Sequence, residues 1–414
     1  MSREIYVYAH WQGMDAQKLG VLRADQVRGS EHFSFTYETT WLTSKYAQQI
    51  DPDLGLFQGE QHSNNDRNFR VFLDSCPDRW GRLIMTRREA VLAKQENRRP
   101  RKLTETDYLM GVHDTHRMGA LRFKLEEDGP FLDDNTHLAT PPISSLRELE
   151  LAASEIEEPG KVNDADYLKW LSMLVSPGSS LGGARPKASV VDENGDLWIA
   201  KFPSRYDDYD IATWEMVVYR LACVAGIDMS PCMIERYNNH QHTFLTKRFD
   251  RVDGERLHFA SAMTQLGYYD GDEGASYLEL AEFLSENGAN TKKDLAQLWR
   301  RIVFNIAISN TDDHLRNHGF IHTSKGWLLS PAYDLNPVPD SSGLHLNIDE
   351  MDNRLDFNLA FSVIDYFQLS QVEAEGIYRE VIESVNQWEK IADGLKINPQ
   401  MRELMAPAFS ATRL

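Results

Sequence analysis

The sequence predicts an α+β fold with two lobes, a β-rich N-terminal part followed by a mainly helical C-terminal part. Three observations lead to this expectation. Alternating apolar residues separated by turn residues predict short strands within residues 1–60 and hairpins between residues 187 and 249. From about residue 260 the chain has a mainly helical pattern. A polar segment, Asn310–Asn317, interrupts that helical region and carries the main functional signal.

The N-terminal part is expected to contain strands, one helix and a closing strand before a linker. The strands are Ile5–Tyr8, Leu19–Leu22 and Phe33–Tyr37, the helix spans 66–95, the closing strand is Gly119–Phe123, and the linker spans 126–142. The linker is acidic and contains Gly, Pro and Asn, which is typical of a domain boundary.

The middle part is expected to alternate helices and hairpins. The helices are 145–157, 164–174 and 212–225, the last ended by Gly226, and the hairpins are 187–202, with an Asn194-Gly195 turn, and 232–249. An apolar helix, Leu298–Ile308, leads into the polar segment, and a hairpin from Gly319 follows it.

Composition restricts the class of protein. The chain has 414 residues, 42% of them hydrophobic, which is enough for two or three domains with real cores. No apolar run approaches the length of a membrane span, and the first residues lack a signal-peptide pattern, so we expect no membrane association. Three dispersed cysteines predict no disulfide framework and fit the cytoplasm.

The formal charge of −19 disfavours a free-standing nucleic-acid binder, because binding to nucleic acid depends on neutralising phosphates. One basic stretch, from Arg87 to Lys102, lies in the N-terminal part. A solvated helix and loop face is the favoured interpretation of it, with DNA contact as the alternative.

The polar segment has the spacing of a kinase catalytic loop. Asp312 and Asn317 are separated by four residues, and Asp334 follows Asp312 by 22 residues. In that chemistry one carboxylate orients the attacking hydroxyl, while an amide oxygen and a second carboxylate hold Mg²⁺ against the ATP phosphates. For this segment alone, a solvated turn is an equally good interpretation.

Two upstream features have the order that nucleotide binding requires. A Gly-rich segment, Ser176–Lys187, precedes a strand, and small residues let backbone N–H groups approach phosphates closely. Lys201 lies inside an apolar strand, and Glu215 on the next helix is its natural partner. Each feature also has an ordinary interpretation. A Gly-rich segment alone is more often a turn, and a strand lysine can extend from the edge of the sheet to solvent.

These motifs resemble the HipA family of bacterial toxin kinases, from type II toxin–antitoxin systems, over nearly the whole chain. The matching segments are Phe72–Arg82, Ser180–Lys187, Ile199–Pro203, Lys247–Arg251, Asn310–Asn317 and Pro331–Asp334. The chain departs from the family pattern at Asp313, where a small residue is common, and at Lys247, where an acid is frequent. Pro186 would stiffen the Gly-rich loop.

The resemblance implies a role for each matched residue. Asp312 would be the catalytic aspartate, Asn317 and Asp334 the Mg²⁺ ligands, and Lys201, paired with Glu215, would hold the ATP phosphates. The remaining ATP-binding residues would be Ser180, Leu181, Gly182, Gly183, Ala184, Arg185, Lys187, Phe249 and His314. Ser180, or its neighbour Ser179, would be autophosphorylated, which inactivates such kinases.

The resemblance also implies three regions and a cellular role. The regions are a β-rich N-terminal subdomain (1–135), an N-lobe with the phosphate loop and lysine (136–258), and a helical C-lobe with the catalytic loop and metal site (259–414). The expected function is ATP- and Mg²⁺-dependent phosphorylation of Ser or Thr in a protein such as an aminoacyl-tRNA synthetase, which arrests growth. A HipB-like antitoxin, expected as a separate chain, would neutralise the kinase and make most DNA contacts.

Two other functions are open at this point. A small-molecule phosphotransferase shares the catalytic logic, but the long β-rich N-terminal part argues against it. The other alternative is a non-catalytic regulator that binds DNA with a partner. The intact set of predicted catalytic residues argues against this alternative: Lys201, Asp312, Asn317 and Asp334.

Overall fold

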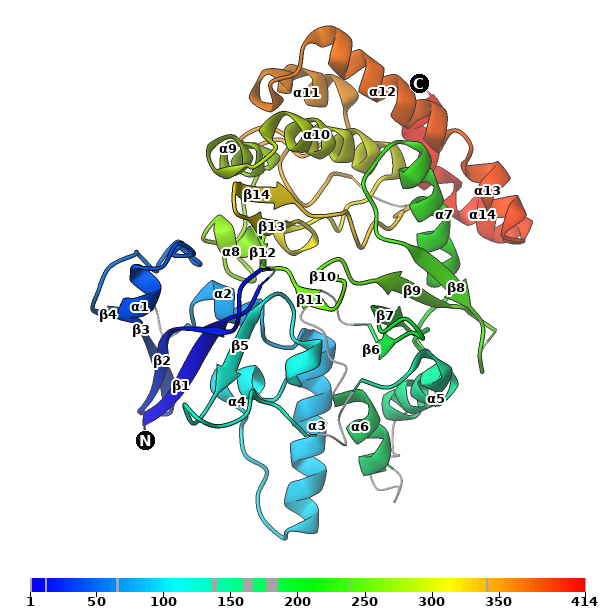
Figure 1. The fold of residues 1–414 in the computed structure, drawn as a ribbon. Helices are drawn as coiled ribbons and strands as arrows, with labels where there is room; N and C mark the ends of the chain where they lie inside the picture. The colour runs from blue at the N-terminus through cyan, green and yellow to red at the C-terminus, as the bar shows by residue number, and fades with distance from the viewer. Residues whose placement is uncertain are drawn as a thin grey trace. The chain divides into compact units, whose positions relative to one another are not determined.

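The computed structural model describes most of the chain as two compact units. The described residues are 2–11, 13–64, 67–135, 140–158, 167–175, 185–238, 240–339 and 342–413. Unit 1 comprises Met1–Tyr206, Tyr237–Asn239 and Asp250–Ala260, and unit 2 comprises Asp207–Arg236, His240–Phe249 and Ser261–Leu414. Figure 1 labels the elements of both units. The three-region division predicted above stays a prediction.

Unit 1 begins with a five-stranded antiparallel sheet in the order β4-β3-β2-β1-β5. The strands are β1 Ser2–Ala9, β2 Gln17–Val27, β3 Ser30–Tyr37, β4 Glu60–His62 and β5 Leu121–Lys124. Ile5, Leu22 and Phe35 lie opposite one another on adjacent strands and are fully buried. Directly opposed residues share a face of the sheet, so these side chains form one apolar surface. The strands predicted within residues 1–60 are confirmed.

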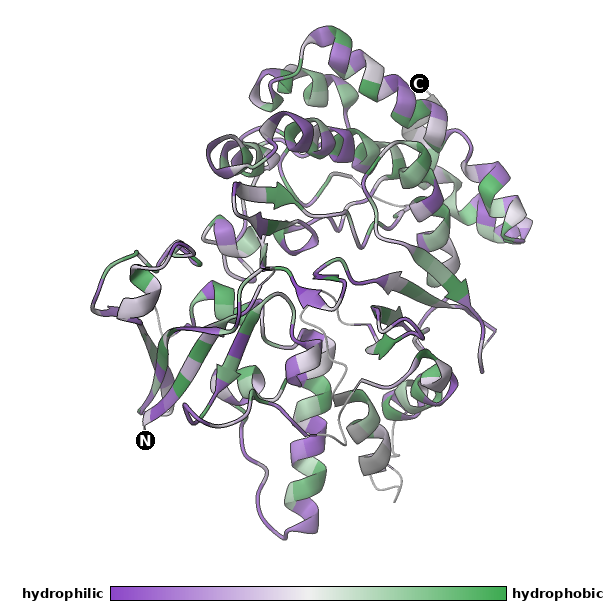
Figure 2. Ribbon diagram, viewed as in Figure 1, coloured by the Kyte–Doolittle hydropathy of each residue, from purple (hydrophilic) through white to green (hydrophobic). Residues whose placement is uncertain are grey.

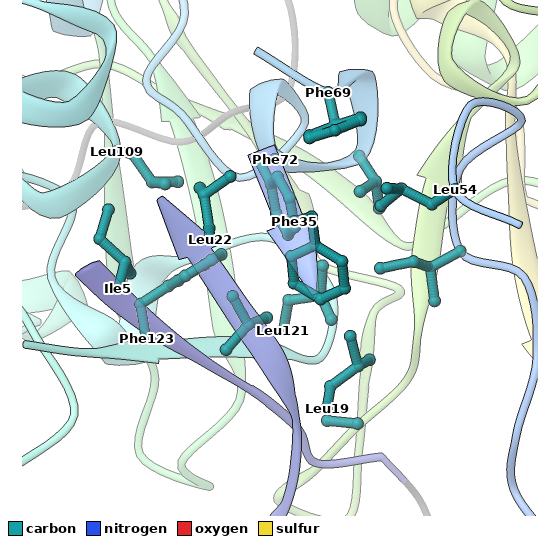
Figure 3. Packing of buried hydrophobic residues seen from close by; sticks show 14 of the residues in the cluster. Ile5, Leu19, Leu22, Phe35, Leu54, Phe69, Phe72, Leu109, Leu121 and Phe123 are labelled. Atoms are coloured by element: carbon teal, nitrogen blue, oxygen red, sulfur yellow. The ribbon is translucent and has the colours of Figure 1, made fainter. Parts of the chain in front are cut away.

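Short helices cover that apolar surface. α2 Arg70–Leu73 and α4 Glu105–Met110 contribute Phe72 and Leu109 to the same buried cluster, as Figure 3 shows. Figure 2 shows hydrophobic and hydrophilic residues alternating along β1, as expected for a sheet with one buried face. The other short helices of this part are α1 Thr39–Leu42 and η1 Asp114–His116.

The single helix predicted over 66–95 was wrong: the segment forms α2 and then a separate helix, α3 Arg79–Gln95. Pro77 has no backbone N–H and disfavours helical geometry in the residue before it. Asp78 then caps α3, because its Oδ1 accepts a hydrogen bond of 2.8 Å from the backbone N–H of Gly81. The apolar spacing continues across this break, which is why the sequence pattern looked continuous.

The rest of unit 1 contains helices and two hairpins. They are η3 Ile143–Ser145, α5 Leu146–Glu157, α6 Tyr167–Val175, β6 Lys187–Val191, β7 Leu197–Lys201, β10 Arg251–Val252 and β11 Glu255–Arg256. In the β6–β7 turn, Asp192 Oδ1 accepts from the backbone N–H groups of Asn194 and Asp196, each at 2.9 Å. Gly195 has φ +83°, a conformation that glycine adopts without strain. The predicted Asn-Gly hairpin is confirmed.

Unit 2 is mainly helical, with two further hairpins. Its elements are α7 Ile211–Val224, β8 Cys232–Glu235, β9 Thr243–Lys247, α8 Ala262–Gln265, α9 Tyr277–Asn287, α10 Thr291–Ile308, η5 Leu315–Asn317, β13 Gly319–Thr323, β14 Gly326–Leu329, α11 Phe357–Ser362, η6 Ile364–Phe367, α12 Gln371–Val385, α13 Trp388–Gly394, α14 Pro399–Met405 and η7 Ala406–Arg413. The short strand β12 Phe259–Ser261 lies where the chain passes from unit 1 to unit 2.

The central element of unit 2 is α10. It packs against α9, α12 and η7, and every residue from Arg301 to Ile308 is buried. Trp299 donates a hydrogen bond of 3.0 Å from Nε1 to the carbonyl oxygen of Ala360. Because this C-terminal half of α10 is buried on all sides, it is a rigid support for the segment that follows. Within the described ranges, no helix is long and apolar enough to cross a membrane.

Candidate active site

The polar segment Asn310–Asn317 forms a loop between α10 and β13, as the sequence predicts. α10 ends at Ile308, and its C-cap Ser309 has a φ of +52°, which turns the chain out of the helix. The Ser309 hydroxyl donates to the carbonyl oxygen of Ala408 at 2.9 Å, and the Asn310 N–H donates to the Asn305 carbonyl oxygen at 2.9 Å. The start of the loop is therefore fixed on two sides.

The loop curls so that Asp312 and Asn317 lie close together. Asn317 Nδ2 donates to the backbone oxygen of Asp312 at 2.9 Å, and the same oxygen accepts from the His314 N–H at 3.1 Å. Asp312 is exposed, whereas Asn317 is 3% exposed. The two side chains thus have different environments, a carboxylate facing solvent and an amide held inside the loop. These environments suit a group that meets an incoming hydroxyl and a group that coordinates an ion.

The acidic neighbour, Asp313, points the other way and is 1% exposed. Its Oδ2 accepts hydrogen bonds from Asn305 Nδ2 at 2.8 Å, from His318 Nε2 at 2.8 Å and from the Tyr277 hydroxyl. Burial alone would raise the pKa of Asp313, but the imidazole of His318 and the hydrogen bonds from His318 and Tyr277 lower it below its usual range. Burial and the Asp313 charge raise the pKa of Tyr277 well above its usual value. Asp313 is therefore a buried hydrogen-bond acceptor, and Asp312 is the acid of the pair that is exposed to solvent.

Asp334 follows a tyrosine that links two parts of the site. The Tyr333 hydroxyl donates to the Arg316 backbone oxygen at 2.8 Å, and its ring stacks on Phe249 with centroids 5.7 Å apart. Asp334 has φ +59°, and its Oδ1 accepts from Asn336 Nδ2 at 3.4 Å. Phe249, which the resemblance places near adenine, is thereby connected through Tyr333 to the catalytic loop.

The donor set in unit 2 fits a magnesium ion. Asn317 Oδ1 is buried and accepts no hydrogen bond from any described residue, so an amide oxygen is left to coordinate. Mg²⁺ prefers oxygen ligands and is usually bound through one or two carboxylates together with substrate phosphates. Asn317 and Asp334 match that pattern. Nowhere in the described ranges do three or more His, Cys, Asp or Glu side chains form a complete metal site.

Two of the lysines predicted to bind nucleotide lie on the β6–β7 hairpin of unit 1. Lys201 in β7 stands directly opposite Lys187 in β6. Lys187 is 2% exposed, and its ammonium forms an ion pair of 2.6 Å with Asp78 at the start of α3. This pair was not predicted, and it uses a side chain that the resemblance assigns to ATP. Arg185 donates a long hydrogen bond of 3.5 Å to the Phe202 carbonyl oxygen.

The remaining predicted residues are placed only in part. Glu215 is a buried residue of α7 in unit 2, and its pairing with Lys201 stays a prediction. His314 lies in the catalytic loop, with its ring 5.9 Å from that of His345. Ser179, Ser180, Leu181, Gly182, Gly183 and Ala184 lie outside the described residues.

Sequence reasoning missed Tyr277, Asn305, His318, Tyr333 and Asp78. One signal was available for Asn305, which interrupts the apolar run Ile302–Ile308, because a polar residue in a buried helix requires a partner. Tyr277 and His318 carry no comparable signal.

The basic stretch in α3 and the loop after it is neutralised in part by neighbouring acids. Arg98 forms ion pairs with Glu89 and Glu96, and Arg101 lies 3.7 Å from Glu89. Both arginines are exposed, as the solvated-face interpretation predicts. Arg87 donates instead to the backbone oxygen of Ile156 at 2.6 Å.

Comparison with known proteins gives three findings. Residues 179–389, just over half of the chain, match the family model described as the HipA-like C-terminal domain. A Sinorhizobium fredii protein named "Putative kinase Y4mE" is 26% identical over 208 residues, and a Haemophilus influenzae protein named "Putative kinase" is 25% identical over 189 residues. The alignments cover 44% and 39% of this chain and 48% and 54% of those proteins, so the chain spans about half the length of the curated relatives it matches.

A solved structure resembles nearly the whole chain. It comes from the Shewanella oneidensis MR-1 complex of HipA, HipB and operator DNA, with a TM-score of 0.68, 16% identity and coverage of 99% of this chain and 96% of that one. This likeness confirms the predicted fold class: α+β and protein-kinase-like, with a β-rich N-terminal region and a mainly helical C-terminal part.

Proposed function

Since this chain belongs to the HipA family of kinase toxins, we propose that it transfers the γ-phosphoryl group of ATP to a Ser or Thr hydroxyl of a protein. The observation that carries the proposal is the geometry of the catalytic loop. It presents the Asp312 carboxylate to solvent and keeps the Asn317 amide oxygen buried and available, with one hydrogen bond joining the two residues. Phosphoryl transfer depends mainly on positioning and charge stabilisation, and such an arrangement supports both.

Each residue then has a defined task. Asp312 orients the acceptor hydroxyl in line with the γ-phosphorus and accepts its proton. Lys201, paired with Glu215, binds the ATP phosphates. Asn317 and Asp334 hold Mg²⁺, which when bound neutralises phosphate charge. The remaining proposed ATP contacts are Ser180, Leu181, Gly182, Gly183, Ala184, Arg185, Phe249, His314 and the backbone of Lys187, whose ammonium is paired with Asp78.

We propose that the kinase inactivates itself by phosphorylating Ser180 or Ser179. Each serine lies in the Gly-rich segment assigned to the ATP phosphates. A phosphoserine carries up to about two negative charges, which would repel ATP from that segment.

The cellular proposal follows from family membership. The substrate is a translation component such as an aminoacyl-tRNA synthetase, and its phosphorylation arrests growth. A HipB-like antitoxin, a separate chain, neutralises the kinase and makes most DNA contacts. The net charge of −19 supports the proposal that the antitoxin, rather than this chain, makes most DNA contacts. The three free cysteines support the cytoplasm as the compartment.

Asp312→Gln tests the catalytic assignment. We expect the variant to bind ATP with an affinity close to that of the wild type but to transfer no measurable phosphate, because the replaced group acts on the acceptor hydroxyl. Isothermal titration measures binding, and mass spectrometry of Ser179 and Ser180 after incubation with ATP and Mg²⁺ measures transfer. Asp365→Gln, at an exposed position on η6, is the matched control and should retain full activity.

Retained phosphoryl transfer in Asp312→Gln would overturn the assignment of Asp312. A wild-type protein that binds a DNA duplex with its partner but never turns over ATP would overturn the kinase proposal itself.

A further inference from the structure

The Asp313 carboxylate collects donors from three elements of unit 2. Tyr277 is the first residue of α9, Asn305 lies in the last turn of α10, and His318 directly precedes β13. All three donate to the same oxygen, Oδ2. The ring of His318 also packs edge-on against that of Tyr277, with centroids 5.8 Å apart. One atom of the catalytic loop is therefore attached to the helices on which the loop rests.

Asn305 extends this attachment to the start of the loop. Its Nδ2 donates to Asp313 at 2.8 Å, while its Oδ1 accepts from Asn310 Nδ2 at 3.1 Å. Its backbone oxygen accepts from the Asn310 N–H at 2.9 Å. One buried residue thus holds positions 310 and 313, so the segment Thr311–Asp312 is anchored at both of its ends.

The negative charge of Asp313 is needed for this arrangement. An ionised carboxylate accepts several hydrogen bonds at one oxygen, and charge-assisted bonds are about twice as strong as neutral ones. An asparagine in its place would present either a weaker acceptor or an NH₂ group to three donors. A buried carboxylate is costly, so its use here favours a role that a neutral residue cannot fill.

We propose that Asp313 is a positioning residue, which fixes the catalytic loop through Tyr277, Asn305 and His318 so that Asp312 and Asn317 point correctly. The inference rests on the proposed kinase function and deepens it. A displacement of about 1 Å in such a site lowers the rate about 100-fold. The loss belongs mainly in kcat, because most of the proposed ATP contacts, Lys201 among them, lie outside the catalytic loop.

Tyr277→Phe is the primary test, since it removes one donor and keeps the ring. We expect kcat to fall about 10-fold and the Mg²⁺ concentration for half-maximal activity to rise, with the KM for ATP changing less than about twofold. Asp313→Asn should lower kcat about 100-fold. In the double variant the losses should not multiply, because both changes break the same contact.

Tyr268→Phe is the matched control. The Tyr268 hydroxyl donates to the Glu279 carboxylate at 2.8 Å, so its loss also removes a tyrosine–carboxylate bond in unit 2, but outside the catalytic loop. We expect its kcat and Mg²⁺ dependence to match the wild type. Near-UV circular dichroism and thermal unfolding of each variant separate a folding defect from a positioning defect.

The outcomes distinguish this inference from the proposed function. If the wild type transfers phosphate and Tyr277→Phe has wild-type kcat and Mg²⁺ dependence, the positioning role is wrong and the kinase proposal stands. Equal losses in Tyr277→Phe and Tyr268→Phe would also overturn it, since they indicate a general effect on unit 2. A wild type without phosphoryl transfer overturns the proposed function. If Asp313→Asn does not fold, Tyr277→Phe alone decides.

Discussion

At the scale of single residues, two neighbouring aspartates have opposite environments. Asp312 is exposed and Asp313 is buried, although they are one peptide bond apart. The difference arises because the loop curls around the Asn317 amide and the buried donors draw Asp313 inward. Local backbone geometry, rather than residue type, therefore decides which of the two acids faces solvent.

Asn317→Ala tests the metal site at this scale. The variant loses the buried Oδ1, so we expect the Mg²⁺ requirement to rise and activity to fall about 10- to 100-fold, with part of the loss recovered at high Mg²⁺. Initial rates across a Mg²⁺ titration measure this. Asn287→Ala, at an exposed position on α9, should leave the titration unchanged. A normal Mg²⁺ dependence in Asn317→Ala would exclude Asn317 as a ligand.

The spacing in the sequence was sufficient to prefer Asp312 over Asp313, but not to explain Asp313. Its partners Tyr277, Asn305 and His318 lie 36, 8 and 5 positions away along the chain. Only the packing of α9 against α10 brings Tyr277 to the loop, and no local pattern encodes that contact.

At the scale of elements, the hairpins were predictable and the α2–α3 break was not. A turn such as Asp192–Gly195 is specified by its own residues, since Asp192 bonds the backbone locally and Gly195 supplies the positive φ. The break at Pro77 was hidden because the apolar spacing on its two sides remains in phase.

The Asp78–Lys187 ion pair gives a prediction for the stability of unit 1. Asp78→Asn keeps a capping side chain for α3 but removes the carboxylate charge 2.6 Å from the buried Lys187 ammonium, which should lower the free energy of unfolding by about 3–5 kcal/mol. Urea unfolding measures the change. Glu4→Gln, which breaks the exposed pair with Arg23, should cost no more than about 1 kcal/mol.

A second substitution separates charge from packing in that pair. Adding Lys187→Met to Asp78→Asn also removes the buried ammonium that has lost its partner carboxylate, so the double variant should regain part of the lost stability. Asp78→Asn with wild-type stability would mean that the pair contributes nothing to the fold.

At the scale of the whole molecule, the α+β plan was predictable because the strand and helix patterns occupy successive parts of the chain. The division of the chain into two units was harder to predict. Residues Tyr237–Asn239 and Asp250–Ala260 return to unit 1 from within the sequence of unit 2. Composition along the sequence can indicate a boundary between two continuous segments. It cannot indicate that a later segment packs into the first unit, because that depends on tertiary contacts.

The charge of the whole chain predicts weak DNA binding by this chain alone. With a net charge of −19 and Arg98 and Arg101 paired with Glu89, we expect a dissociation constant weaker than about 1 μM for a random duplex at physiological salt. Fluorescence anisotropy between 50 and 200 mM salt measures this. The charge reversal Arg99→Glu should have no effect, and tight binding that this variant abolishes would show direct DNA contact.

The register of the β6–β7 hairpin has a consequence for chemical labelling. Lys187 and Lys201 are directly opposed, so both amines leave the same face of the hairpin, yet Lys187 is buried against Asp78 while Lys201 is only partly buried. An amine-reactive probe delivered by a nucleotide analogue should therefore modify Lys201 and spare its neighbour. Mass spectrometry of the labelled peptide would then find the probe on Lys201 alone, although the two lysines stand directly opposite each other on the hairpin.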